Sequence, residues 1–280
     1  MDHDIKKPNA NQWAAGVSPM AIVVPFITAA LGISSAAAAV KKVAYPEVKV
    51  EIVEAYRPDG AFEAMIARFS DAVAKKDAQA LFAQIGPNFV WTLEGALTDE
   101  FDLGRDALHN FKVVFGFREL GKDTDGNVAN GPFWNALTAF AQDKTYYKAT
   151  DVGNLICGPI RANVANDAAF EQARKKIAPA DDDQVEWYFT LGETAVAKTP
   201  GDSGPAVGKV GKVALPVLST APATKPGEPA PAPTFLEVLL PSGKTGWIPA
   251  SAAKQLAAEH LCYAKTVSGE WTIVAYDQPE

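Results

Sequence analysis

Residues 235–251 read FLEVLLPSGKTGWIPAS, and this stretch carries the strongest fold signal in the chain. Two apolar runs, FLEVLLP and TGWIPAS, stand on either side of Ser242-Gly243, a pair that favours a tight turn. Short apolar runs separated by such a turn are typical of an antiparallel hairpin. We therefore predict two paired β-strands between residues 235 and 251.

Similar short runs lie on both sides of this hairpin, and Gly and Pro residues break them up. They read VEWYFTL from residue 185, VGKVGKVALPVL from 207, LCYAKT from 261 and EWTIVAY from 270. Repeated short strands with turn signals predict an all-β region, which we place at residues 181–280. Residues 219–233 are rich in Pro and Ala and predict a long loop between two of its strands.

The preceding part of the chain has a different pattern of apolar residues. Residues 60–76 carry large apolar side chains at helical spacing, and further helices are predicted at 77–85, at 104–117, from Pro132 and at 167–177. Asp77, Asp106 and Asp167 are the expected caps of three of them, and Gly86 with Pro87 is expected to end the helix at 77–85. Residues 43–53, 88–93 and 154–160 are extended in character, the first as an edge strand or a tether. We therefore predict a helix-rich α+β region at residues 40–180, with a domain boundary near Ala180.

Composition limits the classes of protein to which the chain can belong. It has 280 residues, of which 48% are hydrophobic, so it can form real cores. Its formal net charge of −7 argues against a broad attraction to nucleic acid or to an anionic membrane. The basic pairs at 75–76 and 175–176 are interpreted as solvated helix faces.

Residues 20–40 contain no charged residue and read MAIVVPFITAALGISSAAAAV. The apolar centre at 20–33 is short for a membrane crossing, which takes about 20 apolar residues. Small residues at 34–39 offer a cleavage site with Ala37 and Ala39 in its small positions. We therefore expect residues 1–39 to be a signal peptide that is cleaved near Ala39, which predicts a periplasmic or secreted protein. A retained membrane anchor is the alternative.

The two cysteines, Cys157 and Cys262, are far apart in the sequence. An oxidising compartment would allow them to form a disulfide, and two separate buried thiols are the alternative. Neither belongs to a C-x-x-C motif, and the chain has only three histidines. We expect no metal site and no cofactor.

Residues 235–251 resemble the second half of bacterial SH3 domains. The resemblance rests on the Ser242-Gly243 turn, on the pair Gly246-Trp247, and on the small residues at 250–251. Residues 193–213 resemble the opening of such a domain, although they have Ala-Val-Ala at 195–197 where the family usually has Asn-Val-Arg. The proline-rich stretch is an insertion relative to the family. The resemblance implies a C-terminal SH3-like β-barrel, as in alphaproteobacterial exported proteins described only by their SH3 domain.

Residues 62–117 resemble the front of the SnoaL-like fold of the nuclear-transport-factor-2 type. The likeness consists of a helix pair, a strand that ends in Phe-Val-Trp, and a helix that opens with Gly-Arg-Asp-Ala-Leu. It implies an alternative function, a small-molecule enzyme or binder whose pocket would be lined by helices near Phe69 and Phe111. The resemblance does not extend beyond Phe117.

Motifs for catalysis are weak. The sequence around Gly243, Lys244 and Thr245 lacks the first glycine of a phosphate-binding loop. The acidic residues Glu94, Asp99, Glu100 and Asp102 have no companion base identifiable by spacing, and Cys157 precedes Gly-Pro, which disfavours an activated thiol at a helix start. We expect no catalytic residues, although enzymatic activity is left open.

The aromatic residues of the β-rich region are the main candidates for ligand binding. Trp247, Tyr263, Trp271 and Tyr188 either form an exposed groove or belong to the core of the barrel. We predict a non-enzymatic periplasmic protein whose SH3-like domain binds a cell-envelope peptide, glycan or protein. Nucleic acid is not an expected partner, and a membrane is expected only if the N-terminal segment is retained.

Overall fold

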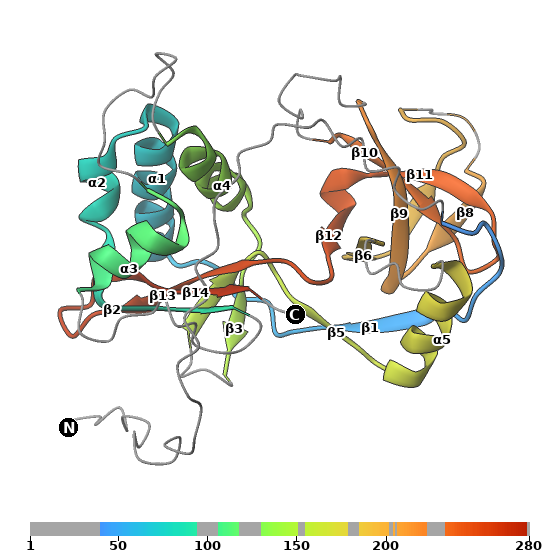
Figure 1. Ribbon diagram of the computed structural model, residues 1–280, viewed down its shortest axis with the longest axis horizontal. Coiled ribbons are helices and arrows are strands. Elements are labelled where there is room, and N and C mark those ends of the chain that lie inside the picture. The colour runs from blue at the N-terminus through green and yellow to red at the C-terminus, as the bar shows by residue number, and fades with distance from the viewer. Residues whose placement is uncertain are drawn as a thin grey trace, which may run out of the picture. The chain divides into compact units, whose positions relative to one another are not determined.

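A computed structural model describes residues 40–93, 106–117, 130–150, 155–178, 185–201, 204, 206–222 and 233–278. Of these residues, 37% are in strands and 29% in helices, and the strands form three sheets (Figure 1). The predicted signal peptide, the acidic loop at 94–102 and most of the proline-rich stretch lie outside the described residues. Residues 179–184, around the predicted domain boundary, lie outside them too.

A five-stranded sheet forms the base on which most helices pack, and its strand order is β2-β14-β13-β4-β3. Strands β13 and β14 form a hairpin, β4 pairs with β13 and β3 in antiparallel fashion, and β2 runs parallel to β14. The strands are β2 Ile85–Leu93, β3 Tyr147–Ala149, β4 Leu155–Gly158, β13 His260–Lys265 and β14 Trp271–Gln278. Because β13 and β14 come from the end of the chain, this sheet joins segments that are distant in sequence.

Four helices pack against this sheet (Figure 1). They are α1 Gly60–Lys75, α2 Ala78–Phe82, α3 Ala107–Val114 and α4 Gly131–Gln142. Asp59, Asp77 and Asp106 precede the first three of these helices, and each carboxylate accepts a hydrogen bond from a backbone N–H of the first turn. These caps satisfy N–H groups that have no partner within the helix.

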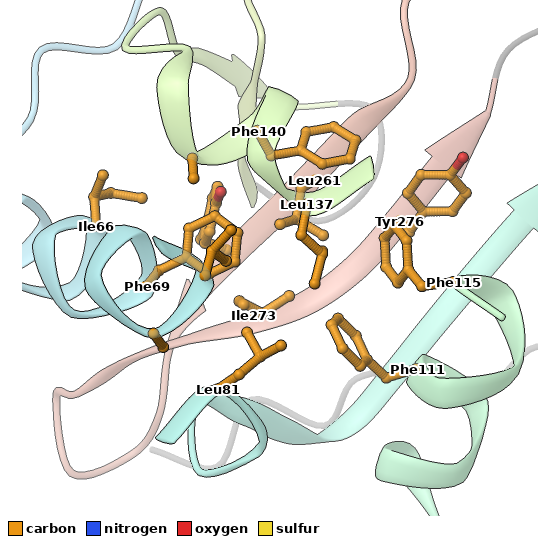
Figure 2. Close-up of a cluster of buried hydrophobic side chains, with 14 of the residues drawn as sticks. Ile66, Phe69, Leu81, Phe111, Phe115, Leu137, Phe140, Leu261, Ile273 and Tyr276 are labelled. Carbon is orange, nitrogen blue, oxygen red and sulfur yellow. The ribbon is translucent and has the colours of Figure 1, made fainter. Parts of the chain in front are cut away.

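The core between these helices and the sheet is rich in aromatic rings (Figure 2). Phe69 and Phe111 are fully buried in it, and the Phe111 ring lies 5.3 Å from the ring of Phe89 on β2. Leu261 and Ile273, from the C-terminal hairpin, complete the cluster from the sheet side. The helices are therefore packed on strands that the chain reaches only at its C-terminal end.

A seven-stranded sheet contains an antiparallel meander and strands from both halves of the chain. Its order is β11-β10-β9-β1-β5, and β6 pairs with both β9 and β12. The strands are β1 Val48–Ile52, β5 Ala162–Val164, β6 Trp187–Thr190, β9 Val213–Ala221, β10 Phe235–Leu239, β11 Thr245–Pro249 and β12 Ala253–Gln255. A short 3-10 helix, Ala250–Ala252, connects β11 to β12. Strands β7 Thr194–Val196 and β8 Gly208–Val210 form a separate hairpin.

Cys157 on β4 and Cys262 on β13 form a disulfide, as predicted. Both residues are buried in a second apolar cluster, which also contains residues of β1, β6 and the helix α5 Asp167–Ile177. The two cysteines lie opposite one another on adjacent strands. The disulfide therefore closes at the point where the chain leaves the five-stranded sheet and later returns to it.

The predicted fold class, a helix-rich α+β region followed by a C-terminal all-β SH3-like barrel, is wrong. Strand exceeds helix in the described residues, and two of the three sheets take strands from both sides of residue 180. Strands β13 and β14 pair with β4 and β2, whereas β1 pairs with β9. The sequence patterns identified strands, but they did not identify the strands' partners.

Three local predictions are also corrected. Strand β1 is not an edge strand, because it pairs with β5 on one side and β9 on the other. Gly86 and Pro87 do not stand in a helix-ending turn but inside β2. Helix α5 is capped by Asn166 rather than by Asp167, since the Asn166 side chain accepts a hydrogen bond from the Ala169 N–H at 3.0 Å.

Candidate ligand-binding surface

The outward side of the meander β9-β10-β11 carries aromatic and apolar side chains. Side chains alternate along a strand, and in β10 Leu236 and Val238 are buried while Phe235 and Glu237 are half-buried. In β11, Ile248 is buried, whereas Trp247 is half-buried and Pro249 is exposed. The buried set fills the core beneath the meander, so the other set faces away from that core.

Strand register places this outward set side by side. Trp247 lies directly opposite Glu237, and Phe235 lies directly opposite Pro249. Ser219 of β9 is the other neighbour of Glu237, and its hydroxyl donates a hydrogen bond of 2.7 Å to the carboxylate. We call Phe235, Glu237, Trp247, Pro249 and Ser219 the outer aromatic face.

Gly246 allows the next strand to approach β11 closely. A Cβ at this position would lie 2.4 Å from a methyl carbon of Val196 and 2.9 Å from the carbonyl oxygen of Ala197. Ala197 and Trp247 exchange two backbone hydrogen bonds, of 2.8 and 2.9 Å. Since Gly246 points inward towards this contact, its neighbour Trp247 points outward.

Phe235 is bordered by the segment that follows β7. Gly201 has a φ of +73°, a conformation that favours glycine, and a Cβ there would lie 3.7 Å from the tip of the Phe235 ring. The outer aromatic face is thus bounded by Gly201 beside Phe235 and by Ala197 beside Trp247.

The structure does not bring the four predicted ligand-binding residues into one site. Trp247 lies on the outer aromatic face, but Tyr188 packs against the core beneath the meander, where burial raises the pKa of its hydroxyl. Tyr263 and Trp271 belong to the other sheet and face the helices. Phe235, Glu237 and Pro249 were missed, although the alternation in FLEVL and TGWIP was the signal that could have found them.

Tyr263 and Trp271 are packing residues of the helical core. Tyr263 is 1% exposed, and its ring lies 5.3 Å from that of Phe62. Trp271 is half-buried with its ring 4.9 Å from the same phenylalanine. Burial raises the pKa of Tyr263 well above its usual value. Neither side chain shares a surface with Trp247.

A pocket of about 390 Å³ lies beside α1. It is lined by Pro58, Phe62, Glu63, Ile66, Ala67, Lys144 and Tyr146. The Lys144 Nζ donates hydrogen bonds to the carbonyl oxygen of Ala141 at 2.6 Å and to the Ser70 hydroxyl at 3.1 Å. Burial lowers the pKa of Lys144. This pocket is distinct from the one predicted near Phe69 and Phe111, since both of those rings are buried in the core.

The described residues offer little for metal or nucleophilic chemistry. Within them, no group of three or more His, Cys, Asp or Glu side chains is arranged to hold a metal ion. Cys157 is bonded to Cys262, so neither sulfur is a free thiol. The carboxylates of the predicted acidic loop, Glu94 to Asp102, lie outside the part of the chain that the structure describes.

Comparison of the chain with protein-family models, with curated proteins and with solved structures yields no match. None of the helices in the described ranges is long and apolar enough to cross a membrane. The function of the protein is therefore inferred from its own geometry.

Proposed function

We propose that the protein is a non-enzymatic binding protein of the cell envelope and that it holds an extended peptide on its outer aromatic face. The observation that carries this proposal is the outward placement of Trp247 beside Glu237, with Phe235 and Pro249 next to them. A large ring that faces away from the core contributes nothing to that core. It offers instead a rigid apolar contact for a ligand.

The chemistry of the face suits a peptide. Aromatic rings and a proline give flat apolar contacts, and one carboxylate between them gives a polar contact that fixes orientation. Ser219 holds the Glu237 carboxylate in place by its hydrogen bond. A glycan, which would stack on Trp247, and a folded protein are the other envelope ligands to be tested.

The resemblance to bacterial SH3 domains supports a binding role. The turn glycine Gly243 has a φ of +81°, Gly246-Trp247 follows it in β11, and the small residues of Ala250–Ala252 form a short 3-10 helix. These are the features on which the resemblance rests. Strand β12 follows this 3-10 helix and pairs with β6, which is the first strand of the segment from β6 to β12.

The envelope location is supported by two observations. The uncharged segment at 20–40 is expected to be an export signal, with the mature chain in the periplasm or outside the cell. The disulfide between Cys157 and Cys262 suits an oxidising compartment, because cytosolic thiols are kept reduced.

The test is calorimetric titration of the full chain with peptides released from the host's cell wall and, separately, with cell-wall oligosaccharides that carry no peptide. We expect peptide binding that W247A weakens at least tenfold, with a free energy of unfolding close to that of the wild type. V267A is the matched control, since Val267 is a fully exposed apolar residue in the β13–β14 turn. Equal peptide affinity for W247A and wild type would rule out the outer aromatic face.

The second candidate function is binding of a small anionic molecule in the pocket beside α1. It is favoured by Lys144, an exposed cation that lines the pocket together with the apolar side chains of Phe62 and Ile66. An anionic fluorescent amphiphile should bind there, and its binding should be lost in K144M but not in K265M, because Lys265 is an exposed lysine that does not line the pocket. Undiminished binding to K144M would remove this candidate.

A further inference from the structure

Five exposed lysines stand on three separate segments whose backbones are in contact. Lys41 and Lys42 precede β1, Lys175 and Lys176 stand in the last turn of α5, and Lys244 lies in the turn between β10 and β11. We call these five residues the basic cluster.

Backbone contacts hold the three segments together. The N–H of Lys41 donates a hydrogen bond of 2.8 Å to the carbonyl of Ile177, the last residue of α5. The N–H of Tyr45 donates one of 3.0 Å to the carbonyl of Pro241. A Cβ on Gly243 would lie only 2.8 Å from the Ala44 nitrogen, so the β10–β11 turn packs directly on the segment that precedes β1.

The basic cluster is not neutralised by ion pairs. Of the described carboxylates, none lies within ion-pair distance of any of its five lysines, whereas Lys75, Lys148, Lys209, Lys254 and Lys265 each have a carboxylate partner. On α5 itself, Glu171 is paired with Arg174 at 3.1 Å. The dipole of α5 favours cations in its last turn, but it gives no reason for the other three lysines.

An exposed apolar residue lies within the same surface. Val43 follows Lys42 directly and is 43% exposed. A cluster of four to eight basic residues at a protein surface is attracted to anionic lipid headgroups.

We propose that the basic cluster binds the surface of an anionic phospholipid bilayer. The formal net charge of −7 disfavours a general attraction to such a surface, so the attraction is confined to this one face. The lysines contact headgroup phosphates, and Val43 lies at the level of the headgroups. This interaction is independent of the outer aromatic face, whose residues it does not use.

The test is sedimentation of the full chain with vesicles of phosphatidylcholine alone and with vesicles containing phosphatidylglycerol. Binding to the neutral vesicles measures the contribution that does not depend on lipid charge. The ratio of the affinity for phosphatidylglycerol-containing vesicles to the affinity for phosphatidylcholine vesicles therefore isolates the charge effect. Each lysine near a membrane surface contributes about a fivefold factor in affinity. We therefore expect K41Q/K42Q to lower the ratio about 25-fold, and high salt to lower it for the wild type.

The control is K75Q/K148Q, which removes the same number of charges from two ion-paired lysines on α1 and β3. It should keep the wild-type ratio. The acidic run at 181–183 is unchanged in every variant, so its charge contributes equally to all of them. A wild-type ratio near one, an unchanged ratio in K41Q/K42Q, or an equal loss in the control would each overturn the proposal.

Discussion

Cys157 and Cys262 lie opposite one another on the adjacent strands β4 and β13, and their disulfide joins two positions 105 residues apart in the sequence. Everything between them, including the meander and α5, leaves the five-stranded sheet and returns to it at this one place. The disulfide therefore fixes both ends of a long excursion of the chain. It also restrains the C-terminal hairpin on which α1 to α4 pack.

Loss of this disulfide should destabilise the protein strongly. In the chain-entropy model, closing a loop of about 100 residues contributes about 4–5 kcal/mol. C157A/C262A should lower the free energy of unfolding by about that amount, measured by urea denaturation without reductant. Reductant should not affect the double variant further. A double variant as stable as the oxidised wild type would contradict this expectation.

Stability should also fall in acid because of His260. This residue is 1% exposed, neither of its ring nitrogens has a hydrogen-bond partner among the described residues, and its ring lies 5.3 Å from that of Tyr147. Burial lowers the pKa of His260 from 6.5 to about 4; the positive charge of Arg161 adds to this and the negative charge of Asp277 opposes it.

The direction in which stability changes with pH follows from proton binding in the folded and unfolded states. Because the unfolded chain takes up a proton near pH 6.5 and the folded one only near pH 4, the stability present above pH 6.5 is lost progressively as the pH falls to 4. This histidine should account for about 3 kcal/mol of that loss. Urea denaturation at pH 7 and pH 4.5 should show a smaller difference for H260L than for the wild type. H109L, at an exposed histidine, should behave like the wild type, and an identical pH dependence in H260L would refute the assignment.

Features set by neighbouring residues could be predicted from the sequence. Asp77 and Asp106 cap helices as expected, because a cap requires only the side chain and the next three residues. The hairpin around Ser242-Gly243 formed for the same reason, since its strands are adjacent in the chain. These elements needed no information about distant partners.

Sheet membership could not be predicted in this way. Alternation identifies a strand, but it does not show which strand lies beside it. The runs from residues 261 and 270 were therefore placed with the other strands of the region 181–280, although the hairpin that they form pairs with β4 and β2. The predicted Cys157–Cys262 pair already contained part of the missing information, because a disulfide requires the Cα atoms of its two cysteines to lie within about 7 Å of one another.

The same limitation affected the candidate site. Trp247 was named as a candidate only because it is an aromatic residue of the β-rich region, and its outward direction follows from the inward-facing Gly246, which the close approach of Val196 requires. Tyr263 was grouped with Trp247 because both are aromatic residues in β-like runs. Its burial against Phe62 depends on α1, which lies about 200 residues earlier in the sequence and gave no local sign of the contact.

Gly246 should tolerate no side chain. The Cβ of G246A would collide with Val196 and with the backbone of Ala197, and relieving such overpacking costs about 1–3 kcal/mol. We expect a loss of this size in the free energy of unfolding, measured by urea denaturation. G211A is the control, because no atom in the described part of the chain lies within 4 Å of a Cβ at Gly211. Equal stability of the two variants would show that β7 and β11 can separate without cost.

The ion pair between Lys254 and Asp143 should contribute less to stability than the other contacts of the same aspartate. The two charged atoms are 2.6 Å apart, and the side chains are 19% and 16% exposed. The other carboxylate oxygen of Asp143 accepts hydrogen bonds from the backbone N–H of Thr145 at 2.7 Å and from its hydroxyl at 2.5 Å. K254M removes one of these interactions, whereas D143A removes all three.

We therefore expect K254M to lower the free energy of unfolding by about 1 kcal/mol and D143A by about 2–3 kcal/mol. The double variant should resemble D143A, because the lysine has no ion-pair partner once the aspartate is gone. K75M, which breaks an exposed pair with Asp71, should change stability by less than about 0.5 kcal/mol. Strict additivity of K254M and D143A in urea denaturation would mean that the pair, despite its short distance, is not coupled in solution.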